Sequence, residues 1–336
     1  MESAGTRRIT YDERWGAGTN EGYMGEERLT LVDFNEAQRV IKGYGGNAGR
    51  KAAVLWEGSL WMVKFPESTA GMRGNILSDT TSPVAEYIGL HVFEQIGVPV
   101  HRTVLGTLEG KVVVACRDLE WESSKRLVTF HDIKNAEDSG RLLPDGTASS
   151  GAALFLSDIG AFLRLSALIG DHDEVIRRFW DMFVVDALIG NGERNNEKWG
   201  FLQAPPFGAL ELAPVYDNGN AMFNKRKPET TELDLGDERR MRSLALGAKS
   251  VFLRDDGHHV KPLDCIVAAA DLDCNAAIRR IVPRIDLSAL ASPIDSIPRE
   301  AYDMPMMPTV AARFHKEIFR IRLEKGLLPA LEVAQR

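Results

Sequence analysis

Residues 82–100, "SPVAEYIGLHVFEQIGVPV", decide the fold prediction because they describe one helix with clear ends. Pro83 is favoured at the first position of a helix, and Gly97 followed by Pro99 is typical of a helix end. Apolar side chains recur at helical spacing, at Val84, Ile88, Val92 and Ile96. Glu86 lies beside this apolar stripe. The sequence therefore predicts a helix that buries one face and carries a carboxylate at the edge of that face.

Two predicted β-hairpins flank this helix. Residues 52–56 and 59–65 are short apolar runs joined by a Glu-Gly pair, which is typical of a compact hairpin. Strand alternation places Lys64 on an apolar face of the second run. Residues 101–120, "HRTVLGTLEGKVVVACRDLE", predict the second hairpin.

The rest of the chain is predicted to be mainly helical. Helical patterns occur at residues 152–168, 174–189 and 309–323. Residues 212–216 are typical of a short strand, which would end at Asp217. Two polar segments, 133–151 and 224–240, are expected to be loops.

A sheet-rich part followed by a helical part predicts an α+β fold with two lobes. The length of 336 residues agrees with about two domains or lobes. We divide the chain into a flexible N-terminal arm (residues 1–28), an N-lobe (29–115), a hinge (116–120) and a C-lobe (121–336).

Composition excludes several classes of protein. A net charge of -7 argues against a nucleic-acid-binding protein that relies on a broad basic face. No apolar run approaches the roughly 18 residues of a membrane span, and the N-terminal residues lack the apolar core of a signal peptide. An odd number of cysteines fits a reducing compartment; they are Cys116, Cys265 and Cys274. We therefore expect a cytoplasmic protein without direct contact to nucleic acid or membrane.

Five features in chain order indicate phosphoryl transfer. They are the Gly-rich "YGGNAGRK" (residues 44–51), Lys64 on a strand, Glu86 on a helix, the polar loop "GNGERNNEKWGF" (190–201) and Asp217. A nucleotide requires backbone donors over its phosphates, a cation for the phosphate oxygens, a carboxylate that orients this cation, and acidic groups for Mg²⁺. This order is typical of a protein-kinase-like site.

The chain also resembles the HipA-like kinases, in particular their stand-alone Helicobacter branch. The resemblance covers most of the chain, from Arg39 to Glu324. It is carried by the helix stretch quoted first, by "YGGNAGRK", and by "WMVKFP" (61–66), "VVVACRDL" (112–119), "FWDMFVVDALIGN" (179–191) and "LAPVYDNGNAMF" (212–223). It implies a two-lobed protein-kinase-like fold with ATP and Mg²⁺ as cofactors.

The resemblance also implies roles for individual residues. Lys64 would be the ATP-binding lysine, Glu86 its ion-pair partner, and Asp217 the metal-binding aspartate. The loop over the phosphates would contain Gly45, Gly46 and Gly49. The hinge that contacts adenine through its backbone would contain Ala115, Cys116, Arg117 and Asp118. The catalytic loop would contain Glu193, Arg194 and Lys198.

This catalytic loop departs from the family pattern, N-x-D-R-H-x-x-N-W-G. The chain keeps Asn191, Arg194, Trp199 and Gly200. It has Glu193, Asn195 and Lys198 where the family has Asp, His and Asn. Glu193 can still accept a proton, with an intrinsic pKa similar to that of Asp. Lys198 has no lone pair for a metal, but its charge could replace that of a second metal ion.

Three functions remain open from the sequence. The first is ATP-dependent phosphoryl transfer to a Ser or Thr hydroxyl of an unknown protein substrate, which could be the chain itself. The second is a pseudokinase that binds nucleotide and serves as an interaction module. The third is a nucleotidyl transferase on the same scaffold. The retained Lys64, Glu86 and Asp217 favour nucleotide binding in all three.

Overall fold

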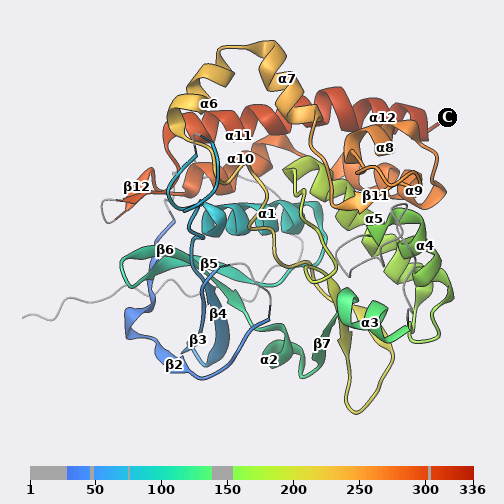
Figure 1. Cartoon of the computed structure of the whole chain (residues 1–336), viewed down its shortest axis with the longest axis horizontal. Helices are drawn as coiled ribbons and strands as arrows, with labels where there is room; N and C mark the ends of the chain where they lie inside the picture. The colour runs from blue at the N-terminus through green and yellow to red at the C-terminus, as the bar shows by residue number, and fades with distance from the viewer. Residues whose placement is uncertain (1–28, 46–48, 75, 138–153, 302–303) are drawn as a thin grey trace, which may run out of the picture.

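The computed structural model describes residues 29–45, 49–74, 76–137, 154–301 and 304–336 (Figure 1). The α+β prediction is confirmed, because a curled β-sheet forms the N-terminal region and helices dominate the C-terminal region. The strands of this sheet are β1 Val32–Asp33, β2 Gln38–Val40, β3 Lys51–Trp56, β4 Ser59–Lys64, β5 Thr103–Leu108 and β6 Lys111–Arg117. Their spatial order is β1-β5-β6-β4-β3-β2. β1 is parallel to β5, and the other neighbours are antiparallel.

Both predicted hairpins are present. β3 pairs with β4 so that Lys51 lies opposite Lys64. The turn between them uses Glu57 and Gly58, at φ angles of 48° and 71°. Positive φ at both turn positions matches the twist of the flanking strands, which explains why the Glu-Gly pair joins them. β5 and β6 form the second hairpin.

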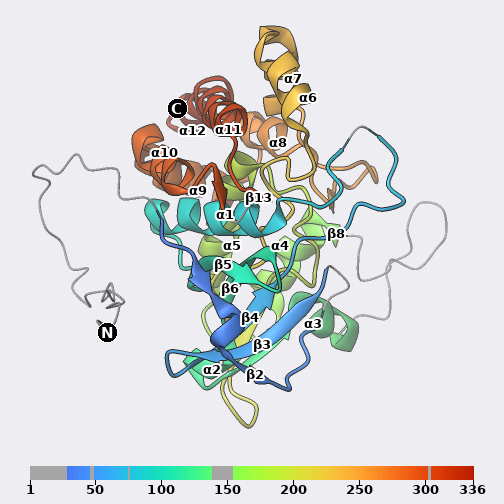
Figure 2. The ribbon, with the colours of Figure 1, turned by 90° about the vertical axis from the view of Figure 1, so that its left-hand side faces the viewer.

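Helix α1 (Ser82–Ile96) lies between this sheet and the helical region (Figure 2). It ends at Gly97, whose φ of 86° is a left-handed conformation that glycine adopts readily. α1 contacts β5 and β6 as well as α5 (His172–Ile189) and α10 (Leu287–Ser296). Because α1 packs on both regions, it positions the sheet relative to the helices.

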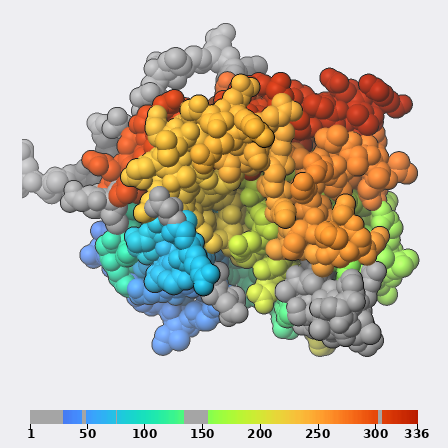
Figure 3. All heavy atoms as spheres, turned by 45° about the horizontal axis from the view of Figure 1, so that its top comes forward, coloured from blue at the N-terminus to red at the C-terminus, as the bar shows by residue number. Residues whose placement is uncertain are grey.

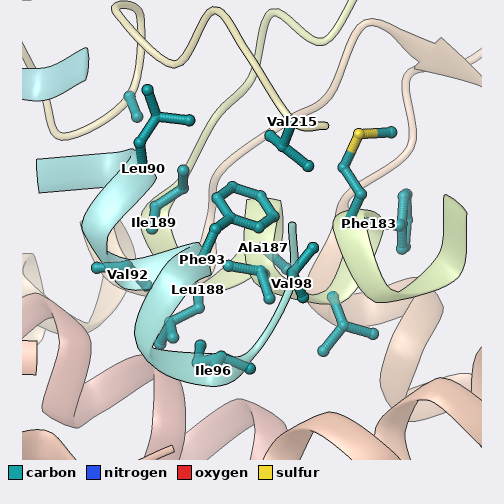
Figure 4. Packing of buried hydrophobic residues seen from close by; sticks show 14 of the residues in the cluster. Leu90, Val92, Phe93, Ile96, Val98, Phe183, Ala187, Leu188, Ile189 and Val215 are labelled. Atoms are coloured by element: carbon teal, nitrogen blue, oxygen red, sulfur yellow. The ribbon is translucent and has the colours of Figure 1, made fainter. Parts of the chain in front are cut away.

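One apolar core continues from α1 into α5 (Figure 4). The buried side chains at this junction include Leu90, Phe93, Ile96, Leu188 and Ile189. Full burial of one such side chain contributes about 1.5–3 kcal/mol. The helix that carries Glu86 is therefore anchored by apolar packing along its length.

The remaining helices lie mostly in the C-terminal region. Their bounds are α2 Leu119–Ser123, α3 Phe130–Glu137, α4 Leu156–Leu165, α6 Pro228–Leu235, α7 Glu238–Leu246, α8 Pro262–Ala268, α9 Leu272–Ile281, α11 Thr309–Arg322 and α12 Leu328–Ala334. Shorter helical turns occupy Phe34–Glu36, Val282–Arg284 and Leu323–Leu327. α4, α5 and α11 confirm the three predicted helices, although α4 is shorter than expected.

Small sheets complete the described part of the chain. β7 (Arg126–Thr129), β9 (Gly200–Gln203) and β10 (Leu210–Leu212) form one of them, in the order β10-β9-β7. β8 (Leu154–Phe155) pairs with β11 (Phe252–Leu253), and β12 (Glu300–Ala301) pairs with β13 (Met304–Pro305).

The strand predicted at residues 212–216 is wrong in its position. β10 ends at Leu212, and the proline that follows two residues later has no N–H group for a ladder. Val215 instead forms an isolated parallel bridge to Val100. Its N–H donates to the carbonyl oxygen of Pro99 at 2.8 Å. Asp217 therefore follows an irregular segment rather than a strand end.

The loop predicted at residues 224–240 is also wrong, because α6 and α7 occupy most of it. Pro228 opens α6, and the Asp237 carboxylate caps α7 by accepting from the N–H of Arg240 at 3.0 Å. Because this stretch is polar, Pro228 and Asp237 were not recognised as the residues at which helices begin. The other predicted loop, 133–151, lies largely outside the described residues.

The connection between β4 and α1 lies against the segment that precedes α6 (Figure 3, cyan beside yellow). The N–H of Leu77 donates to the carbonyl oxygen of Lys225 at 3.1 Å, and that of Thr81 donates to Asn224 at 2.7 Å. The two regions are therefore joined by backbone hydrogen bonds as well as by α1.

The predicted division into arm, lobes and hinge stays a prediction. The arm, residues 1–28, lies outside the described residues. β6 runs without a break through the expected boundary between residues 115 and 116. Across the described ranges, none of the helices combines the length and apolar character needed to cross a bilayer.

Candidate functional site

Three charged side chains from separate parts of the chain meet between the sheet and α1. Nζ of Lys64, the last residue of β4, lies 3.1 Å from Oε1 of Glu86 on α1. It also lies 3.1 Å from Oδ1 of Asp217. The backbone N–H of Asp217 donates to the same Glu86 oxygen at 3.0 Å. The predicted ion pair between Lys64 and Glu86 is confirmed, and Asp217 joins it.

Burial and charge act in opposite directions on this group. Burial would lower the pKa of Lys64, but the negative charges of Asp217 and Glu86 outweigh burial and raise it. Burial would raise the pKa of Asp217, whereas Lys64 and Lys198 hold it well below its usual range. Lys64 likewise keeps the pKa of Glu86 low despite burial. All three side chains are therefore ionised at neutral pH.

A glycine on α1 allows the segment around Asp217 to approach this helix. A Cβ atom on Gly89 would lie only 2.9 Å from Cβ of Asn218. Asp217 itself has a φ of 62°, which is uncommon for a residue with a side chain. Such conformations cluster at functional sites.

His101 is a buried neighbour of this group that the sequence analysis missed. Its Nε2 lies 3.5 Å from Oε1 of Glu86. Together with Cys116, these residues form a group of potential metal ligands whose atoms lie within 4.8 Å of one another. Burial raises the pKa of the Cys116 thiol, so this group lacks the thiolate that binds metal ions. His101 is better explained as a support for the Glu86 carboxylate, and no spacing in the sequence links the two.

Arg194 belongs to the loop that follows α5. Its fully buried guanidinium donates to both carboxylate oxygens of Asp186 at 2.8 Å. It also donates to the carbonyl oxygens of Lys198 at 2.9 Å and Tyr216 at 2.5 Å, and to Oδ1 of Asn218. These contacts tie α5, the loop and the segment after β10 together. They describe a positioning residue, and the predicted catalytic role of Arg194 stays a prediction.

Glu193 and Lys198 contact each other in the same loop. Nζ of Lys198 lies 3.4 Å from Oε2 of Glu193, and Nδ2 of Asn220 donates to that oxygen at 2.6 Å. The Glu193 side chain is 52% exposed, whereas that of Lys198 is 9% exposed. Because Lys198 also lowers the pKa of Asp217, its positive charge acts on both carboxylates.

Comparison with known proteins finds relatives along most of the chain. No protein-family model matches the chain. The serine/threonine-protein kinase CtkA of Helicobacter pylori is 29% identical over 312 residues, which cover 91% of this chain and 88% of the relative. The crystal structure of the H. pylori proinflammatory kinase CtkA matches with a TM-score of 0.79 at 27% identity, covering 91% of this chain and 99% of that chain. HipA of Shewanella oneidensis MR-1, in a complex with HipB and operator DNA, matches with a TM-score of 0.52 at 14% identity over 94% of this chain and 68% of that chain.

This chain resembles the HipA-like kinases. The resemblance predicted from the motifs is confirmed by the CtkA match along most of the chain. The HipA match, at its low identity, shows a shared fold. The roles of individual residues in this chain stay predictions.

The predicted phosphate-covering loop leads into β3. The carbonyl oxygen of Gly45 accepts a hydrogen bond from Nζ of Lys51 at 2.5 Å. Gly49 has a φ of 66°, so a side chain at this position would strain the backbone. Gly46 lies outside the described residues. The phosphate-binding roles of the three glycines stay predictions.

The first two predicted hinge residues lie in the middle of the sheet. Ala115 and Cys116 are fully buried on β6 between β4 and β5. Burial raises the pKa of the Cys116 thiol, so the thiol is neutral. The Cys116 sulfur lies within 4.8 Å of a carboxylate oxygen of Glu86, next to the charged group.

The next two hinge residues already use their backbone donors within the protein. The N–H of Arg117 donates to the carbonyl oxygen of Arg102 at 2.8 Å, and that of Asp118 donates to Leu60 at 2.9 Å. The Asp118 carboxylate caps α2 and binds Nζ of Lys42 at 2.7 Å. A nucleotide base would not find these two N–H groups available, and the hinge assignment stays a prediction.

A second buried arginine, Arg322 of α11, was not identified from the sequence. It donates to the carbonyl oxygens of Leu188 and Ala245, each at 2.9 Å. These carbonyls lie in the last turns of α5 and α7, where a positive charge is favoured. Burial lowers the pKa of Arg322. A Cβ atom on Gly190 would lie 2.5 Å from its Nη2, so Arg322 supports the start of the loop.

Proposed function

We propose that this chain binds ATP with Mg²⁺ and transfers a phosphoryl group to a Ser or Thr hydroxyl of a protein. One observation carries the proposal: Nζ of Lys64 lies 3.1 Å from both Glu86 and Asp217. This arrangement presents an oriented ammonium next to an ionised carboxylate, which are the groups that phosphates and a divalent cation require. The name of the H. pylori relative supports the choice of a Ser or Thr acceptor.

The residues of the site fit a magnesium ion bound with nucleotide. Mg²⁺ usually takes one or two carboxylates together with substrate phosphates. Asp217 is ionised, and its side chain is 30% exposed beside the deeply buried Glu86. We assign Asp217 as the metal-binding residue. When bound, Mg²⁺ would neutralise charge that develops on the phosphate oxygens.

Each charged side chain of the site would then have its own role in the reaction. Lys64, held by Glu86, would orient the α- and β-phosphates. Glu193 would accept the proton of the acceptor hydroxyl, which requires that it leave Lys198. Lys198 would turn toward the phosphates and supply a positive charge where the family has a metal-binding Asn. Positioning and electrostatic stabilisation account for most of the catalysis of phosphoryl transfer.

A second candidate function is a nucleotide-binding protein without transfer activity. The contact of 3.4 Å between Lys198 and Glu193 favours it, because a base held by an ammonium is a poor proton acceptor. In this case the chain would bind ATP and act as an interaction module.

Intact-mass measurement after incubation with Mg²⁺ and ATP tests the proposal. The purified chain and dephosphorylated casein serve as acceptors, with Asp217→Asn as the inactive control. A mass increase of one phosphate on either protein, absent in the control, supports phosphoryl transfer. A mass increase of one AMP would instead support a nucleotidyl transferase. ATP binding without any adduct would support the second candidate.

A further inference from the structure

Lys51, at the start of β3, faces the charged group, whereas its neighbour Arg50 does not. Successive residues of an extended backbone project to opposite faces. Arg50 binds the Glu109 carboxylate at 2.5 Å and 2.8 Å and lies over the ring of Phe65. These contacts place the Arg50 side chain on one face of the sheet. Lys51 therefore lies on the opposite face, which it shares with Lys64.

The register of the hairpin places Lys51 directly opposite Lys64. Residues in such a pair share one face of the sheet, with Cβ atoms about 4.5–5.5 Å apart. Like charges in this position destabilise a sheet. Nζ of Lys51 donates to the carbonyl oxygen of Gly45, in the loop expected to cover the phosphates.

A third lysine adds to this concentration of positive charge. Burial lowers the pKa of Lys51, and the positive charges of Lys64 and Lys198 lower it further. Asp217 and Glu197 act in the opposite direction but do not cancel the shift. Three ammonium groups thus act on one region of the site. A ligand with several negative charges would relieve their repulsion.

We propose that Lys51 is a second phosphate-binding lysine, which contacts the β- or γ-phosphate of the nucleotide from the strand opposite Lys64. The inference rests on the proposed nucleotide binding. The hydrogen bond to Gly45 holds the ammonium beside the first glycine of the stretch expected to bind the phosphates. Lys51 and Lys198 would together supply positive charge from the protein where the family pattern has an asparagine ligand for a metal.

The alternative is that Lys51 only holds Gly45 in place. The two roles make opposite predictions for the protein without ligand. Loss of a structural contact would lower the melting temperature. Loss of a cation that repels Lys64 would leave the melting temperature unchanged or raise it.

Calorimetric affinities for ATP, ADP, AMP and adenosine, measured with Mg²⁺, test this inference. The variants are Lys51→Met, Lys51→Arg and the control Lys111→Met, which removes an exposed lysine from the same sheet. Lys51→Met should weaken ATP binding roughly ten- to a hundredfold, the worth of one hydrogen bond to a charged group. Adenosine has no phosphate that Lys51 could bind, so its affinity should change by less than about twofold. Lys51→Arg should recover part of the loss, and Lys111→Met should bind like the unchanged protein.

The outcomes separate this inference from the proposed function. If ATP binds the unchanged protein and Lys51→Met equally well, the inference fails and nucleotide binding stands. Equal losses for ATP and adenosine, with a lower melting temperature, would overturn it in favour of the structural role. If the unchanged protein binds none of the four compounds, the proposed function fails and the inference fails with it.

Discussion

Lys198 and Glu193 form an ion pair at 3.4 Å inside the loop that would carry the reaction. Nδ2 of Asn220 donates to the same Glu193 oxygen, so the carboxylate has two partners within the protein. A hydroxyl substrate would have to displace at least one of them. The two candidate functions differ in whether this pair opens when nucleotide binds.

Glu193→Gln should abolish phosphoryl transfer without weakening ATP binding, because the amide keeps the shape of the side chain but cannot take up a proton. Intact mass should therefore show no transfer by this variant, while calorimetry should show an unchanged Kd for ATP. Glu197→Gln, an exposed carboxylate of the same loop, is the matched control and should retain transfer. Equal transfer by Glu193→Gln and the unchanged protein would contradict a role for Glu193 as base.

Restoring the family residues at both divergent positions offers a further comparison. If the natural loop is active, Glu193→Asp combined with Lys198→Asn should change the transfer rate without being required for transfer. Transfer that occurs only in this double variant would show that the natural chain has lost the activity and would favour the second candidate function.

Lys64→Met should lower the stability of the ligand-free protein by about 3–5 kcal/mol, because it leaves the buried Glu86 without its cation. It should also abolish the increase in melting temperature caused by ATP and Mg²⁺. Lys111→Met, which removes a lysine that is half exposed and paired with Asp79, should change neither quantity. Denaturant unfolding and thermal melts measure both effects. A Lys64→Met variant that ATP still stabilises would rule out the assigned phosphate contact.

Arg194→Met should destabilise the protein by about 3–5 kcal/mol, since it leaves Asp186 buried without its guanidinium partner. Arg254→Met is the matched control, because Arg254 also binds an aspartate, Asp256, but at an exposed position. Urea denaturation of both variants gives the comparison. Similar small losses in the two variants would show that Arg194 does not hold the loop.

The sequence predicted those parts of the fold whose signals are local. The Glu57-Gly58 turn and the end of α1 at Gly97 follow from backbone preferences of a few residues, and both are present. The chain order of Lys64, Glu86 and Asp217 predicted the charged group, because each residue had a recognisable position in a motif.

The sequence did not predict contacts between residues far apart in the chain. Arg322 reaches the carbonyl oxygen of Leu188 across 134 residues, and no periodicity marks it as a helix-capping residue. His101 was missed for the same reason. The segment 224–240 was predicted as a loop because it is rich in charged residues. Some of these charges pair within the folded protein, as the buried Asp234 does with Arg240 at 2.8 Å.

The stability of the protein should fall between pH 7 and pH 4 because of His315. Burial, together with the nearby charge of Arg322, lowers the pKa of His315 to about 4. The unfolded chain, with a pKa of about 6.5, binds the proton first, so stability is present above pH 6.5 and is lost as the pH falls toward 4. The expected loss from this residue is about 3 kcal/mol.

His315→Gln should remove this part of the pH dependence, and His258→Gln, at an exposed position, should not. Urea denaturation at pH 7 and pH 4 measures the difference. Identical losses in the His315 variant and the unchanged protein would show that His315 is not held neutral in the folded state.

Calorimetric titration with ATP, in the presence and absence of Mg²⁺, tests the central claim that Lys64, Glu86 and Asp217 form a nucleotide site. The unchanged protein should bind ATP more tightly with Mg²⁺ than without it, and Asp217→Asn should lose this dependence on Mg²⁺. A thermal melt of each variant without ligand confirms that the protein is folded. If the folded, unchanged protein gives no binding heat and no shift in melting temperature with millimolar ATP and Mg²⁺, the charged group is not a nucleotide site and the account is wrong.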